Sequence, residues 1–219
     1  TGEPYALEGL LRLSHSRSKK RDWALSMMRQ LVSDDASKAA ELGAKALLIR
    51  SVTRRSLRSP HTGTLVYKEG TKKIPAAALS LEDADLVARV AKRGPVKLRL
   101  KMGAKMLPDA ESANVVAELE GRDKPDEVVI IGCHIDSWDT GQGAHDDAAG
   151  CLMAMEAARL LKSNGLVPKR TIRVVLYTNE ENGGAGGRAY VKAHGDETHV
   201  IGIEADSGGW QPWGFGIGP

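Results

Sequence analysis

The second half of the chain alternates short apolar runs with helical patterns, and this alternation limits the folds available to it. The runs at 128–131, 171–178 and 199–205 are rich in β-branched residues and have the length of strands. The stretches at 147–162 and 186–194 carry apolar side chains at helical spacing. Strands that alternate with helices pair in parallel through helical crossovers. We therefore predict an α/β fold, with a mixed, largely parallel sheet and helices on both faces.

The first half shows similar signals in shorter elements. Glycines and basic residues close two of its predicted helices, as is common at helix ends. The pattern predicts helices at about 18–30, 37–43 and 81–94, and strands at 44–51, 74–80, 96–102 and 112–121.

The composition argues against two classes of partner. With 31 basic and 28 acidic residues, the formal charge is +3, too small to predict binding to nucleic acid or to an acidic membrane. The basic run at 17–21 is better explained as a solvated helix start. No apolar run approaches the roughly 18 residues of a membrane span, and no signal-type stretch follows Thr1. The two cysteines, 133 and 151, provide no disulfide framework and leave the redox compartment open.

Acidic and imidazole side chains follow each of three predicted strands. Ligands of open α/β sheets bind at the carboxyl ends of the strands, so these side chains are expected to meet at one rim. They are His134, Asp136 and Asp139 after the first strand, Glu180 and Glu181 after the second, Asp206 after the third, and His145, Asp146 and Asp147 in the loop before the next helix.

So many like charges would raise one another's pKa values unless a cation lies among them. Imidazole nitrogen and carboxylate oxygen are the ligands of zinc or manganese sites. His134 and Asp136 share a strand face, so Asp136 can fix the tautomer of a ligating His134. Of the pair Glu180 and Glu181, one can bind metal while the other holds the proton of an activated water. The rim therefore predicts a hydrolytic metal centre.

These features also have structural interpretations. An acidic pair is often a solvated loop, and Asp146-Asp147 can cap the helix that follows. Cys133 should point to the strand face opposite His134, into the core. The glycine-rich segment at 183–189 lacks a dinucleotide-binding frame and is expected to let the backbone turn close to the site. Direct roles are less expected for His145, His194 and His199.

Three segments resemble the M28 family of co-catalytic zinc peptidases. They are GCHIDSWDTGQGAHDDAAG at 132–150, RTIRVVLYTNEENGGAGGRAY at 170–190 and GIEADSG at 202–208. The resemblance extends from Ser37 to the end of the chain. It implies an N-terminal helix of the peptidase domain at 1–36, part of a protease-associated insertion at 37–80, and the catalytic domain at 81–219.

The resemblance also implies a role for each rim residue. Asp146 would bridge two zinc ions, His134 and Asp206 would complete the first site, and Glu181 would belong to the second. Glu180 would be the general base and acid, Asp136 would orient His134, and the peptide between Asp146 and Asp147 would be cis. The implied activity is a metallo-exopeptidase of carboxypeptidase or dipeptidase type, acting on dipeptides or short peptides. A homodimer and a secreted or lysosomal location are likewise implied.

Two departures from the family pattern leave an alternative open. The family takes a final His for the second zinc from a loop beyond the third strand, and this sequence ends at Pro219 before such a loop. Between Gln30 and Ser37 the family has a longer stretch. We expect an incomplete chain of a peptidase. The alternative is a truncated or pseudo-peptidase binding domain without a complete second metal site, and a reading frame extended past Pro219 would discriminate between them.

Overall fold

The computed structural model describes residues 5–6, 36–51, 58–60, 65–105, 107–138, 141–206, 209, 211, 214 and 216. The chain divides into two compact units, residues 1–107 and 108–219, and each is described by itself. The predicted helix at 18–30, the basic run at 17–21 and Asp139 lie outside the described residues. The domain boundaries implied at residues 36 and 80 stay predictions.

Among the described residues, the first unit contains two small strand pairs and two helices. Its elements are β1 (Tyr5–Ala6), a short helix at 36–41, β2 (Leu47–Arg50), β3 (Ala76–Leu79), α2 (Leu81–Ala91) and β4 (Lys97–Leu98). β2 pairs with β3 in parallel, and β1 pairs with β4 antiparallel. Ser80 begins α2, because its hydroxyl accepts a hydrogen bond from the amide of Asp83 at 3.1 Å. β4 is shorter than the strand predicted at 96–102.

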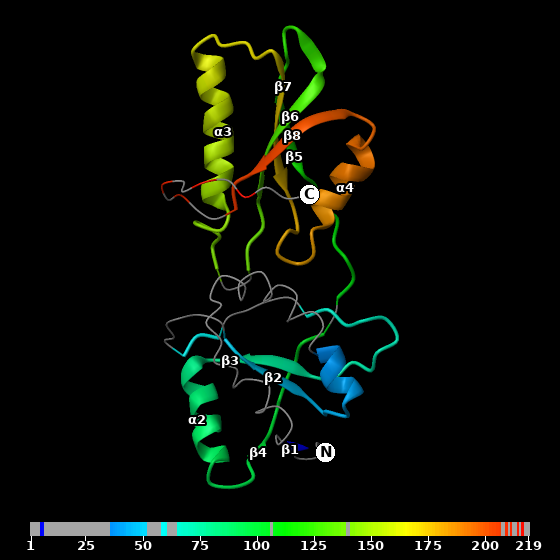
Figure 1. Ribbon diagram of the computed structural model, residues 1–219, viewed down its shortest axis with the longest axis vertical. Coiled ribbons are helices and arrows are strands. Elements are labelled where there is room, and N and C mark those ends of the chain that lie inside the picture. Colours follow the sequence, from blue (N-terminus) through cyan, green and yellow to red (C-terminus); the bar gives the residue numbers. More distant parts are fainter. Residues whose placement is uncertain are drawn as a thin grey trace. The chain divides into compact units, whose positions relative to one another are not determined.

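The second unit is built on a four-stranded sheet (Figure 1). Its elements are β5 (Val115–Leu119), β6 (Lys124–His134), α3 (Ala148–Ser163), β7 (Arg170–Tyr177), α4 (Ala185–His194) and β8 (Thr198–Glu204). The strand order is β5-β7-β6-β8, in which β6 is parallel to β7 and β8, and β5 is antiparallel to β7. The prediction of a mixed, largely parallel sheet is confirmed.

Neighbouring residues of β7 show that the two helices cover opposite faces of this sheet. Leu176 packs in one core cluster with Cys151 of α3. The ring of Tyr177, the next residue, meets the ring of Tyr190 of α4 edge to face, with centroids 5.8 Å apart. Successive strand side chains point to opposite faces, so α3 and α4 lie on either side of the sheet (Figure 1). The predicted placement of helices on both faces is confirmed.

A buried arginine joins several elements on the α4 face. The guanidinium of Arg173 in β7 donates to the Glu118 carboxylate of β5 at 2.5 Å and to the Glu197 carboxylate at 2.5 Å. It also donates to the hydroxyl of Tyr190 at 2.7 Å, and that hydroxyl lies 2.9 Å from Nε2 of His199. The arginine side chain is 9% exposed. This network fastens β5, α4 and the start of β8 to the central strand β7.

Replacement of Arg173 by Met should lower the free energy of unfolding by about 2 kcal/mol. Loss of the cation removes a charged donor from two carboxylates and from a buried hydroxyl, and the partial exposure of those carboxylates keeps the loss below that of a fully buried pair. Arg159→Met is the matched control, since Arg159 forms its pair with Glu156 on the exposed surface of α3. Urea denaturation should show a clear loss for the first variant and little change for the second. Equal losses would contradict the role given to Arg173.

Within the described part of the chain, no helix is long and apolar enough to cross a membrane.

Candidate metal centre

His134 is the last residue of β6, and its ring lies between two carboxylates. Its Nε2 is 3.1 Å from Oδ1 of Asp146, which follows in the loop before α3. The same nitrogen is 3.1 Å from Oδ1 of Asp206, which follows β8. The ring is buried, with 1% of the side chain exposed. The parallel strands β6 and β8 therefore bring together three side chains that the sequence placed at one rim.

The second nitrogen of this ring fixes the tautomer. Nδ1 of His134 lies 3.0 Å from the backbone carbonyl of Asp136, so Nδ1 carries the proton and donates it. Nε2 then presents its lone pair to the carboxylate oxygens of Asp146 and Asp206. This lone pair and the two anionic oxygens repel one another, and a cation or a proton between them would stabilise the arrangement.

Two groups of donors around His134 could hold a divalent metal ion, namely His134 with Asp147 and Asp206, and His134 with Asp146 and Glu181. Tetrahedral bonds of about 2.0–2.2 Å place nitrogen and oxygen ligands about 3.3–3.6 Å apart, a little more than the 3.1 Å separations around His134. Burial by itself lowers the pKa of His134, but hydrogen bonding to Asp206 and to the Asp136 carbonyl raises it above its usual value. The same electron-rich groups that favour a proton on the imidazole would favour a metal ion in its place.

The carboxylate of Asp136 holds the neighbouring loop. Its Oδ1 accepts the backbone amide of Glu180 at 2.9 Å, and its Oδ2 accepts that of Glu181 at 3.1 Å. Its contact with His134 is longer, at 3.8 Å from Oδ1 to Nδ1. Asp136 thus touches the imidazole through its carbonyl and positions the acidic pair through its side chain. Sequence spacing gave no signal of the second contact, which joins the ends of two strands.

Glu181 completes a second group of donors with His134 and Asp146. One ligand atom from each of the three residues lies within 4.8 Å of the others. Oε1 of Glu181 is buried. Burial, followed by the negative charges of Asp146 and Glu180, raises the pKa of Glu181 to about 7. A cation among these carboxylates would stabilise the ionised form of Glu181.

Asp147 has a structural position directly beside these donors. Its Oδ2 accepts the backbone amide of His134 at 3.1 Å, and its Oδ1 accepts that of Gly150 at 3.0 Å. It therefore caps α3 and ties the helix start to the end of β6. Burial raises its pKa. The peptide between Asp146 and Asp147 is cis, as the family resemblance implied. Of the acidic pair, Asp147 caps the helix and Asp146 faces His134.

Gly150 allows α3 to approach the segment that follows β8 and carries Asp206. A Cβ at this position would lie 2.0 Å from the carbonyl oxygen of Ala205 and 2.3 Å from Oδ1 of Asp147. The Gly150→Ala variant should lose about 2–3 kcal/mol of stability through overpacking, although alanine is normally the better helix former. Gly187→Ala in α4 is the matched control, because a Cβ there meets nothing within 4 Å. We expect a lower melting temperature only for the first variant, and an unchanged melting temperature for it would show that the helix can shift.

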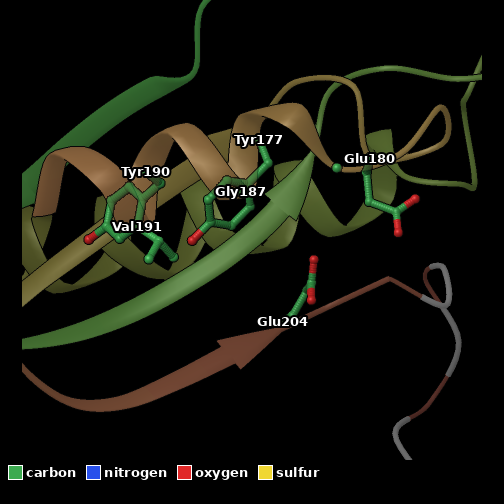
Figure 2. A pocket seen from close by; sticks show the side chains of 7 residues that line it. Tyr177, Glu180, Gly187, Tyr190, Val191 and Glu204 are labelled. Atoms are coloured by element: carbon green, nitrogen blue, oxygen red, sulfur yellow. The ribbon is translucent and has the colours of Figure 1, made fainter. Parts of the chain in front are cut away.

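A cavity of about 300 Å³ borders Glu180. Figure 2 shows the carboxylates of Glu180 and Glu204 near one end and the side chains of Tyr190 and Val191 near the other. The residues that line it are Tyr177, Glu180, Gly184, Gly187, Tyr190, Val191 and Glu204. Glu204 was not among the residues predicted from the sequence. Its place in β8, two residues before Asp206, is the signal that could have identified it.

Asn114 fixes the start of α4 close to the end of β7. Its amide donates to the carbonyl of Gly186 at 2.9 Å, and its side-chain oxygen accepts the amide of Thr178 at 3.0 Å. A Cβ on Gly186 would lie 2.4 Å from that oxygen. The glycine-rich segment thus brings the backbone close to the rim, as predicted. The role of Asn114 was not predicted, since it precedes β5, far from this segment in sequence.

The other residues considered from sequence lie apart from these donors. Cys133 is fully buried in the core cluster between the sheet and α3, as predicted. His194 lies 2.7 Å from a carboxylate oxygen of Glu197, and His199 contacts Tyr190, so both belong to the α4 face. His145 is exposed and belongs to none of the donor groups found among the described residues.

Comparison with protein families matches residues 114–215 to peptidase family M28. The chain therefore carries a domain of peptidase family M28. All of the donors described above lie within this M28 domain. The match agrees with the resemblance seen in the three motifs and with the mixed sheet of the second unit.

Known relatives extend the likeness beyond the M28 domain. Bovine carboxypeptidase Q is 47% identical over 185 residues, which is 83% of this chain and 39% of that protein. A probable leucine aminopeptidase 2 of Aspergillus oryzae is 32% identical over 152 residues, 68% of this chain and 30% of that protein. The crystal structure of a peptidase M28 precursor from Shewanella amazonensis superposes with a TM-score of 0.77 at 35% identity, covering 94% of this chain and 52% of that one. The chain thus spans well under half the length of these curated relatives.

Proposed function

We propose that the protein is a zinc metallo-exopeptidase that hydrolyses dipeptides or short peptides. The observation that carries this proposal is the convergence of Nε2 of His134 with carboxylate oxygens of Asp146 and Asp206 at the carboxyl ends of parallel strands. The location of this cluster within an M28 domain supports it.

His134, Asp146 and Asp206 would hold one ion, and Asp146 would share a second with Glu181. We propose two zinc ions in the complete protein, for which this chain supplies four of the ligands. Bound zinc would supply a Lewis acid for the scissile carbonyl and lower the pKa of the attacking water. The carbonyl of Asp136 keeps Nε2 of His134 available as a ligand, and its carboxylate holds Glu180 and Glu181 in place.

Glu180 would act as general base and acid. Its backbone is fixed by Asp136, and its side chain borders the cavity, where a substrate could approach (Figure 2). It would take the proton of the attacking water and return it to the leaving amine. Glu181, the neighbouring residue, would instead bind metal together with the donors around His134.

The names of two relatives support the proposed substrate class. The named relatives are a carboxypeptidase at 47% identity and an aminopeptidase at 32% identity, and both names denote enzymes that act at a chain end. The higher identity favours the carboxypeptidase or dipeptidase type. We also propose, from the family likeness, a homodimer in a secreted or lysosomal location.

Metal analysis combined with dipeptide hydrolysis tests the proposal. The purified protein should contain zinc, hydrolyse a series of dipeptides, lose activity to a chelator and regain it with added zinc. A protein that takes up no divalent metal would refute the metal centre. A protein that binds zinc and dipeptides but shows no turnover would favour the alternative, a pseudo-peptidase binding domain without a complete second site. Calorimetric titration with dipeptides distinguishes this last outcome from failure to bind substrate.

A further inference from the structure

The two cysteines of the chain lie together behind the metal centre, although they are far apart in sequence. Cys133 occupies the end of β6 next to His134, and Cys151 lies in the first turn of α3. Their sulfur atoms and a carboxylate oxygen of Asp147 lie within 4.8 Å of one another. Cys133 is 0% exposed and Cys151 is 5% exposed. The sulfurs thus face each other across the contact between sheet and helix.

We propose that Cys133 and Cys151 form a disulfide when the protein folds under oxidising conditions. The bond would close the loop of residues 134–150, which carries His134, Asp136 and Asp146. Both ends of the loop would then be covalently joined at its base. A closed loop has fewer conformations in the unfolded chain, so the bond should stabilise the folded arrangement of these side chains. This inference does not depend on peptidase activity.

The surroundings favour a disulfide over a second metal site. Both carboxylate oxygens of Asp147 already accept backbone amides, from His134 and Gly150. Structural zinc usually has four protein ligands, most of them Cys or His, and only three donors from the described part of the chain meet here.

Oxidation of the two thiols would remove only weak hydrogen bonds. The Cys151 thiol donates to the carbonyl of His134 at 3.2 Å, and the Cys133 thiol lies 3.8 Å from the carbonyl of Val175. Thiols are weak donors, and the second of these contacts is long. The disulfide therefore costs the fold no strong hydrogen bond.

The oxidant would be a small-molecule disulfide such as oxidised glutathione. One cysteine thiolate attacks it, which forms a mixed disulfide and releases one glutathione thiol. The other cysteine then attacks the mixed disulfide, so that the Cys133–Cys151 bond forms and the second glutathione thiol leaves. Because both sulfurs are buried in the folded protein, this exchange belongs to folding, before α3 packs on β6. The folded protein should then keep its redox state.

The protein should therefore be produced both in a bacterial periplasm, which is oxidising, and in a reducing cytoplasm. Each sample is unfolded in denaturant with N-ethylmaleimide and no reductant, and its intact mass is measured. The periplasmic protein should carry no adduct and be lighter than the unmodified chain by two hydrogen atoms, and digestion should yield a peptide pair linked through Cys133 and Cys151. The cytoplasmic protein should carry two adducts and melt about 5–10 °C lower.

The double variant Cys133→Ala/Cys151→Ala is the control, and it should melt at the same temperature from both sources. Two adducts on the periplasmic protein would overturn the proposal, as would a covalent dimer on a non-reducing gel. Zinc or cadmium bound in proportion to the protein, and lost in the double variant, would assign the cluster to a metal instead. The mass comparison of the unsubstituted protein decides the question even where the double variant does not fold.

Discussion

The Glu180→Gln variant should retain its metal and lose about 100-fold or more of its turnover number. A general base contributes about 10²- to 10⁴-fold to such a reaction, and glutamine cannot carry the proton. Glutamine keeps the length of the side chain, and the bond that fixes this residue to Asp136 comes from the backbone amide. The loop should therefore keep its position. Dipeptide hydrolysis and zinc content, measured on the same sample, test the expectation.

Glu120→Gln provides the matched control, because Glu120 is exposed beyond the end of β5. It should leave turnover unchanged. If the Glu180 variant keeps full activity, Glu180 is not the proton carrier. If it loses zinc as well as activity, Glu180 is a ligand rather than a base, and the assignments of Glu180 and Glu181 would need to be exchanged.

The Asp146→Ala variant should lose metal first and activity as a consequence. Asp146 approaches His134 directly and belongs to the donor group with Glu181. Loss of a residue that only supports a ligand typically weakens metal binding 10- to 100-fold, so loss of this one should weaken it by more than about 100-fold. Without the ion, the remaining carboxylates would repel one another and loosen the rim. Equilibrium dialysis with zinc measures the affinity, and thermal melting measures the loosening.

Asp126→Ala is the control for this variant, since Asp126 is an exposed carboxylate near the start of β6. It removes the same charge from the protein at a distance from the rim along the strand. Zinc affinity should stay the same in this variant. Equal weakening in both variants would mean that net charge, rather than ligation by Asp146, governs binding. The two main predictions are thus separable, because the Glu180 variant keeps zinc and the Asp146 variant loses it.

The strands and helices of the second unit were predictable from local patterns. β7 (Arg170–Tyr177) and α4 (Ala185–His194) lie within a residue of the predicted positions, because apolar spacing and turn residues act over short stretches. β6 begins earlier than predicted, at Lys124, where a bulge interrupts the register before Val128. Pro125 and its charged neighbours resemble a turn in sequence, and the bulge accommodates them at the start of the strand.

Pairing direction was predictable only in part. The helices between β6, β7 and β8 required parallel crossovers, and those three strands are parallel. β5 has no such helix before β6, and its antiparallel position beside β7 depends on long-range pairing. The salt bridge from Glu118 of β5 to Arg173 supports that position. No local pattern in either strand indicates this partner.

The residue pattern alone predicts which side chains gather at the rim, since His134, Glu181 and Asp206 each lie at or shortly after the end of a strand and parallel strands end at one edge. Contacts between distant segments determine how those side chains are held. The carboxylate of Asp136 binds the loop of Glu180, and Cys133 faces Cys151 across the core. The physical reason is range: periodicity and turn chemistry act among neighbours in the chain, whereas these contacts form only when strand order and helix packing bring distant segments together.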